Sequence, residues 1–222
     1  AVVCDGLGGL SLGEVASGNV ILAFDKWFKE QFMAPGAEWT GESIRNSWED
    51  IIYSMNQKIK EYGASQGVEM GTTITAVLFL KDKYYAIHVG DSRLYELSDG
   101  CRQITEDQTL IARELAQGII TKEQALTDSR RNVLLQCIGV TQKLLPAFYS
   151  GNINGEAAYL VCSDGFRHVI TPDEIYQLCR PLQNLTQKVM QVNLTSLVER
   201  VKQRGERDNI SAVLIQVGRE TC

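Results

Sequence analysis

Histidine and paired cysteines are scarce in this sequence. Its 222 residues include only two histidines, and its six cysteines are scattered without a C-x-x-C pair. This pattern argues against a zinc site. Four of the cysteines lie inside apolar segments, where a thiol behaves as a small hydrophobic group. We therefore expect a reduced, cytoplasmic protein.

Long apolar runs, a leader sequence and basic stretches are missing as well. No run approaches the roughly 18 apolar residues that a membrane-spanning helix needs, and no charged and apolar leader precedes a small-residue cleavage site. The formal charge is −5, and lysine and arginine do not gather into the stripe that nucleic acid requires. We expect no membrane span, no secretion and no nucleic-acid partner. The apolar content of 44% suffices for the core of one monomeric domain.

Hydrophobic periodicity predicts alternating blocks of helices and strands. Helices are expected over 11–32, 43–62, 172–179 and 185–204, with a polar helical insertion from 105 to about 139. Strands are expected over 71–80, 83–89, 92–98, 144–149, 157–163 and 209–217. The first three of these strands are typical of an antiparallel meander. Strands bracketed by helix pairs, without strict β-α-β alternation, predict an α+β domain in which helices cover two antiparallel sheets.

Two helix starts carry specific signals. Thr171, Pro172 and Glu174 provide an N-cap residue, a proline in the first turn and an acid at the third position. Thr121 and Gln124 have the spacing of a capping box inside the helical insertion. We therefore expect helices to begin at both threonines.

Four aspartates stand at the ends of strongly apolar strands. Asp5, Asp91 and Asp164 follow such strands, and Asp208 immediately precedes the last one. Taken singly, each acid also suits a hairpin turn or a solvated loop. Taken together, they would converge on one rim of a sheet pair and raise one another's pKa values.

A divalent cation cluster would resolve this repulsion. Carboxylates, backbone carbonyls and water are the ligands that suit Mg²⁺ or Mn²⁺. A glycine follows the acid in Asp5-Gly6 and in Asp164-Gly165, and it allows a main-chain carbonyl to approach an ion closely. The remaining polar candidates have plainer interpretations. Ser92 and Ser163 are interpreted as structural, His88 and His168 as packed or exposed side chains, and Arg93 as either a phosphate ligand or the partner of a carboxylate.

Several segments, in chain order, carry a resemblance to a known family. They are DGLGGLSLGEVAS (5–17), GTTITAVLFL (71–80), HVGDSRLYEL (88–97), ITEDQTL (104–110), RNVLLQCIG (131–139), LVCSDGF (160–166) and ERDNISAVLI (206–215). Together they resemble successive motifs of the metal-dependent serine/threonine protein phosphatases, the PPM or type 2C family. Leu7 stands where animal members often have a histidine, so the chain looks closer to bacterial members.

The resemblance implies a fold and a domain organisation. The implied fold is a four-layer αββα sandwich of two mainly antiparallel sheets flanked by helix pairs. Residues 1–222 would form one catalytic domain, with a mobile helical flap at about 105–145 beside the active site.

The resemblance also implies a binuclear Mn²⁺ or Mg²⁺ centre. Asp5 would bridge the two ions, the carbonyl of Gly6 would complete the second ion, and Asp164 and Asp208 would hold the first. Asp91, together with Asp164, matches residues that bind a third, weaker ion in bacterial members. A hydroxide shared by the two ions would attack phosphoserine or phosphothreonine. The implied partners are phosphorylated proteins, namely a bacterial serine/threonine kinase and its substrates.

The family pattern includes an arginine followed by an Asn-Glu-Asp segment upstream of the first acid. This segment does not precede Asp5 in the sequence, so we expect either that the sequence is N-terminally incomplete or that the natural protein lacks the segment. Two hypotheses therefore stand. The first is an active phosphatase, and the second is a catalytically impaired relative that binds metal or a partner without turnover.

Overall fold

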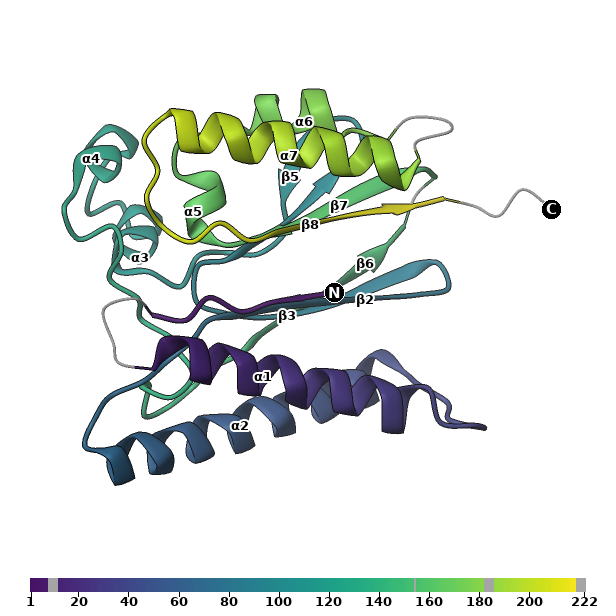
Figure 1. Ribbon diagram of the computed structural model, residues 1–222, viewed down its shortest axis with the longest axis vertical. Helices are drawn as coiled ribbons and strands as arrows, with labels where there is room; N and C mark the ends of the chain where they lie inside the picture. Colours follow the sequence, from purple (N-terminus) through teal and green to yellow (C-terminus); the bar gives the residue numbers. More distant parts are fainter. Residues whose placement is uncertain (8–11, 154, 182–185, 219–222) are drawn as a thin grey trace.

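The structure is a computed structural model that describes residues 1–7, 12–153, 155–181 and 186–218. Figure 1 shows two sheets stacked face to face, with helices on both outer sides. Each sheet has four antiparallel strands, in the orders β1-β2-β3-β6 and β5-β4-β7-β8. The predicted α+β sandwich is therefore confirmed.

The strands of the first sheet are β1 (Val2–Val3), β2 (Ile74–Leu80), β3 (Lys83–Val89) and β6 (Ala147–Asn152). Those of the second sheet are β5 (Cys101–Gln103), β4 (Arg93–Leu97), β7 (Ala157–Cys162) and β8 (Ala212–Val217). Strand β6 lies a few residues later than the predicted 144–149. The short strand β5 was not predicted from the sequence.

Two pairs of helices form the outer layers (Figure 1). The first sheet is covered by α1 (Gly13–Trp27), which continues as the π-helix η1 (Phe28–Phe32), and by α2 (Gly41–Gln66). The second sheet is covered by α6 (Pro172–Cys179) and α7 (Gln187–Gln203). Three short helices gather at one end of the sandwich, namely α3 (Leu110–Ala116), α4 (Lys122–Thr127) and α5 (Asp164–Arg167).

Helix boundaries follow the local signals where these are strong. The side chains of Thr171 and Thr121 accept backbone hydrogen bonds from Glu174 and Gln124, and each pair forms a complete capping box. Helix α1 begins at Gly13 after Leu12, which has the left-handed φ of 61°. The predicted start at Ser11 lies outside the described residues.

Three apolar layers hold the sandwich together. One lies between the first sheet and α1 and α2, one between the two sheets, and one between the second sheet and α6 and α7. Strand β7 is buried along its whole length because both of its faces are covered. Its alternate residues serve different layers: Tyr159 and Val161 pack between the sheets, whereas Ala158 and Leu160 face the helices.

The predicted three-strand meander is wrong in its third strand. Strands β2 and β3 pair as expected, but β4 pairs with β5 and β7 in the other sheet. The chain crosses between the sheets at Gly90, whose φ of 111° is a conformation that side chains disfavour. A Cβ atom at this position would lie 2.6 Å from Thr73 Cγ2. Alternating hydrophobicity cannot report which sheet a strand joins. The crossover places Asp91 at the corner where the two sheets meet.

Across the parts of the chain that the structure describes, no helix has both the length and the apolar character needed to cross a bilayer.

Candidate active site and metal centre

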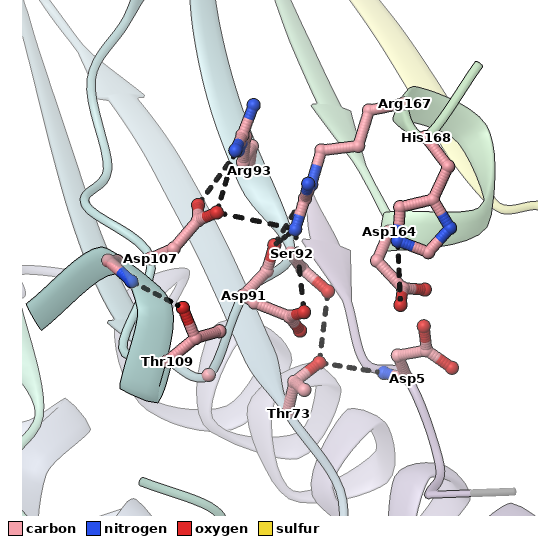
Figure 2. Close-up of polar contacts among 12 residues, drawn as sticks. Asp5, Thr73, Asp91, Ser92, Arg93, Asp107, Thr109, Asp164, Arg167 and His168 are labelled. Atoms are coloured by element: carbon pink, nitrogen blue, oxygen red, sulfur yellow. Dashed lines mark hydrogen bonds and ion pairs between the residues drawn. The ribbon is translucent and has the colours of Figure 1, made fainter. Parts of the chain in front are cut away.

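One cleft collects all the residues that the sequence marked as metal ligands. Asp5, Gly6, Asp91, Asp164 and Asp208 line a cleft of about 540 Å³. The carboxylates of Asp5 and Asp164 point toward one another (Figure 2). The expected convergence of acids from separate strand ends is therefore observed, whereas their role as metal ligands stays a prediction.

Backbone contacts hold Asp5 in place while its carboxylate remains available. The Asp5 amide donates to Thr73 Oγ1 at 3.0 Å, and the Asp5 carbonyl accepts from the Thr73 amide at 2.9 Å and from Thr72 Oγ1 at 2.9 Å. The next residue must be glycine, because a Cβ atom on Gly6 would lie 2.3 Å from the carbonyl oxygen of Gly13. The first turn of α1 therefore packs directly on the Asp5-Gly6 backbone.

Asp164 enters the cleft as the first residue of α5, directly after β7. Its Oδ1 atom is buried and has no hydrogen-bond partner among the described residues. Its Oδ2 atom lies 3.4 Å from His168 Nε2. A buried carboxylate oxygen without a donor is unfavourable unless a cation or water satisfies it. This oxygen is the feature of the site that best fits a bound metal ion.

Asp208 reaches the cleft from the loop before β8, close to Asp164. A Cβ atom on Gly165 would lie 2.4 Å from the carbonyl oxygen of Asn209 and 3.2 Å from Asp208 Cβ. The absence of a side chain at Gly165 thus lets the Asp208 loop approach the start of α5. Glu206 supports the same loop, because its Oε1 atom accepts from the Asp208 amide at 2.9 Å.

Two of the acids, Asp5 and Asp91, have raised pKa values. The pKa of Asp5 is raised to about 8, first by burial and then by the charges of Asp164, Asp208 and Asp91. Burial also raises the pKa of Asp91 to about 6, against the opposing effect of Arg167. Dications among these groups would offset the repulsion. Within the described ranges, however, no group of three or more His, Cys, Asp and Glu side chains is arranged so that it could hold a metal ion by itself.

The corner beside Asp91 holds a network of ion pairs that the sequence did not reveal (Figure 2). Arg93 donates to both carboxylate oxygens of Asp107, at 2.8 and 2.7 Å. Of its two interpretations, the structure therefore favours pairing with a carboxylate. Arg167 Nη2 donates to the Asp91 carbonyl at 3.0 Å and lies 3.3 Å from Asp107 Oδ2. Arg167 follows Asp164 by three residues in the four-residue helix α5, which is too short to give a sequence signal for this contact.

The two histidines have different surroundings. His88 is fully buried between Thr75 Oγ1 and the Gly90 carbonyl, both 2.9 Å from its ring nitrogens. Because a carbonyl can only accept, Nε2 carries the proton in the neutral ring. His168 lies between Asp164 and Glu206, with Nδ1 3.2 Å from Glu206 Oε2. His88 is therefore a packed side chain, whereas His168 touches a cleft residue, which the sequence interpretation missed.

Ser92 and Ser163 have structural partners, as the sequence analysis expected. Ser92 Oγ lies 3.0 Å from the hydroxyl of Thr73. Ser163 Oγ accepts from the Ser211 amide at 3.1 Å and donates to the Asn209 carbonyl at 3.3 Å. Both serines therefore join segments that carry the acids.

Part of the cleft wall comes from the end of the predicted helical insertion, where the structure has turns and isolated bridges instead of the expected helix. Five residues of the segment 132–141 line it, namely Asn132, Leu134, Cys137, Val140 and Thr141. The start of the insertion is fastened to the corner at Gly90, whose amide donates to Gln108 Oε1 at 2.9 Å and whose carbonyl accepts from the Gln108 amide at 2.8 Å. The insertion and the acids therefore form one continuous site.

Comparisons with known proteins identify relatives of this chain. A family model described as protein phosphatase 2C matches residues 1–202. The serine/threonine phosphatase stp of Listeria innocua is 30% identical over 218 residues, which cover 97% of this chain and 83% of that protein. The crystal structure of serine/threonine phosphatase Stp1 from Staphylococcus aureus matches with a TM-score of 0.85 at 25% identity, covering 97% of this chain and 82% of that chain. The catalytic domain of the serine/threonine protein phosphatase PstP, in complex with two manganese ions, matches with a TM-score of 0.77 at 27% identity, covering 97% of this chain and 85% of that chain.

Proposed function

The chain belongs to the protein phosphatase 2C family, and we propose that it hydrolyses phosphoserine and phosphothreonine in proteins with the help of two divalent cations. The observation that carries this proposal is the buried, unpartnered Oδ1 atom of Asp164 in a cleft shared with Asp5 and Asp208. Mn²⁺ or Mg²⁺ would suit these hard oxygen ligands. When bound, two such ions supply a nucleophilic water at neutral pH and offset the charge of the phosphoryl oxygens.

Each acid has a separate task in this proposal. Asp5 would bridge the two ions, and its fixed backbone leaves the carboxylate free to do so. The carbonyl of Gly6 would complete one ion, and Asp164 and Asp208 would hold the other. Because no three side chains in the described part of the chain suffice by themselves, water molecules would fill the remaining ligand positions, as is usual for Mg²⁺.

The cleft wall formed by the segment 132–141 would contact the phosphoprotein. Its polar residues Asn132 and Thr141 line the same cleft as the acids. We propose that the partners are a serine/threonine kinase and the proteins it phosphorylates. Among the described residues, all five cysteines are free. The cytoplasmic location, the single domain and the monomeric state stay predictions.

Asp164→Asn tests the proposal because it keeps the shape of the side chain and removes its charge. Hydrolysis of p-nitrophenyl phosphate and of a phosphothreonine peptide would be measured with and without Mn²⁺. We expect the Mn²⁺-dependent rate of this variant to fall by about 100-fold or more. The matched control is Asp50→Asn, on the exposed face of α2, which should leave the rate unchanged.

Equal rates for the wild-type protein and Asp164→Asn would end the catalytic proposal. Thermal stabilisation by Mn²⁺ without any hydrolysis would instead support the impaired relative. The two hypotheses left open by the sequence are thus separated by one pair of measurements.

A further inference from the structure

Arg167 lies directly against one of the four acids of the cleft. Its Nη2 atom lies 3.0 Å from the Asp91 carbonyl oxygen and 3.4 Å from Asp91 Oδ2, and its Nε atom lies 3.3 Å from the same carbonyl. The two side chains are only 12% and 10% exposed. Solvent therefore screens this pair much less than a surface ion pair.

No other acid competes strongly with Asp91 for the positive charge of Arg167. The nearest other acid is Asp107, 3.3 Å away, but Asp107 is already engaged by both ends of the Arg93 guanidinium. The Arg93 guanidinium is held in turn by Tyr95, whose hydroxyl accepts at 3.0 Å. Two arginines and two aspartates therefore form a group whose formal charges sum to zero.

The other acids of the cleft are in a different electrostatic situation. Among the residues that the structure describes, neither Asp5 nor Asp208 forms an ion pair, and the only ion-pair partner of Asp164 is His168. None of these three carboxyl groups has an arginine or lysine partner among the described residues, and this environment suits divalent cations. Asp91 differs from them because the Arg167 guanidinium, which is held by the Asp91 carbonyl, already pairs with the Asp91 carboxylate.

We propose that Arg167 takes the place of a third divalent cation at Asp91, so that this chain binds two ions and excludes a third. The inference rests on the proposed two-ion site and names which acids belong to it. A dication beside Asp91 and Asp164 would lie next to the fixed guanidinium of Arg167 and be repelled by it. Arg167 also positions the site, because it ties the Asp91 corner to the helical turn that begins with Asp164.

Counting bound ions tests this inference without using activity. Binding of Mn²⁺ would be measured by equilibrium dialysis and by electron paramagnetic resonance, up to millimolar concentrations. The variants are Arg167→Gln, which keeps a hydrogen-bond donor without the charge, and Arg167→Lys, which keeps the charge. Arg167→Met serves as a second neutral variant, and circular dichroism verifies that each protein is folded.

We expect two ions in the wild-type protein and in Arg167→Lys. The neutral variants should gain a third ion, because removing one adjacent positive charge strengthens cation binding by about tenfold or more. This additional ion should disappear again in the double variant Asp91→Asn/Arg167→Gln. In EDTA, Arg167→Gln should lower the melting temperature and the double variant should restore it, since Asp91→Asn removes the unpaired buried charge.

Three results would overturn the inference. One is a third ion in the wild-type protein that Asp91→Asn removes, and another is a count of two in the neutral variants. The absence of bound Mn²⁺ in every protein would overturn it together with the proposed function. If only the inference about Arg167 is wrong, the first two ions still bind, and this result is distinguishable from a failure of the proposed function.

Discussion

Replacing Gly165 with alanine would test how Asp164 and Asp208 are held next to one another in the cleft. The new Cβ atom would lie 2.4 Å from the Asn209 carbonyl oxygen, about 1 Å closer than ordinary contact distances. This oxygen is part of the backbone, so it cannot rotate away as the end of a side chain would. Either α5 or the Asp208 loop must therefore move.

Hydrogen bonds on the other side of the loop oppose this movement. Ser163 Oγ donates to the Asn209 carbonyl, the Ser163 amide donates to the Ser211 carbonyl at 2.9 Å, and the Ser211 amide returns a bond to Ser163 Oγ. Overpacking of a fixed site of this kind costs about 1–3 kcal/mol, which lowers the melting temperature of a domain of this size by about 5 °C. Displacing Asp208 from Asp164 should weaken Mn²⁺ binding by about 10- to 100-fold, as loss of support around a metal ligand does.

Two measurements check this prediction. Thermal unfolding in EDTA measures the loss of melting temperature. Isothermal titration calorimetry with Mn²⁺ measures the loss of Mn²⁺ affinity. The matched control is Gly18→Ala in the middle of α1, where an added Cβ atom meets nothing within 4 Å. This control should raise the free energy of unfolding by about 0.5–1 kcal/mol, since alanine stabilises a helix interior relative to glycine. A Gly165→Ala protein that binds Mn²⁺ as tightly as the wild type would refute the close-approach argument.

Two further predictions concern stability alone. Burial lowers the pKa of His88 to about 4, against the raising effect of Asp107, so the unfolded chain binds a proton at higher pH than the folded protein does. The stability that the neutral ring provides is complete above about pH 6.5 and decreases by about 3 kcal/mol toward pH 4. His88→Gln should remove this part of the acid sensitivity in urea denaturation, whereas parallel pH profiles of the two proteins would contradict it. Thr171→Ala should lower the free energy of unfolding by about 1 kcal/mol through loss of the α6 cap, with Mn²⁺ binding unchanged, and an unaltered urea midpoint would count against the capping box.

The elements that could be predicted from sequence are those whose signals are local. The start of α6 at Thr171 and the antiparallel pair β2 and β3 follow from neighbouring residues alone. The convergence of the acids on one cleft was also predictable. Buried strands of a sandwich end at its rim, so an acid that directly follows a fully apolar strand lies at that rim, outside the core. Asp5 and Asp164 therefore lie in one cleft.

The parts that could not be predicted depend on contacts between distant segments. Strand β4 joins the second sheet because Gly90 turns the chain at a positive φ against Thr73, and hydrophobic alternation carries no information on this choice. The helical turn α5 has four residues, too few for a periodic signal. Arg167 and Asp91 are 76 positions apart in sequence, so neither residue reveals the other.

The arginine pairs show why similar local sequence does not imply similar chemistry. All four acids stand at strand ends, and by that criterion all four are metal ligands of equal standing. In the folded protein, two partly buried guanidinium groups pair with Asp107 and Asp91, whereas Asp5, Asp164 and Asp208 share one cleft without an arginine or lysine partner among the described residues. A site that attracts dications needs net negative charge, and among these acids only the group of Asp5, Asp164 and Asp208 lacks a neutralising arginine. We therefore expect the reach of the long Arg167 side chain, rather than the number of acids at the rim, to set how many metal ions this protein binds.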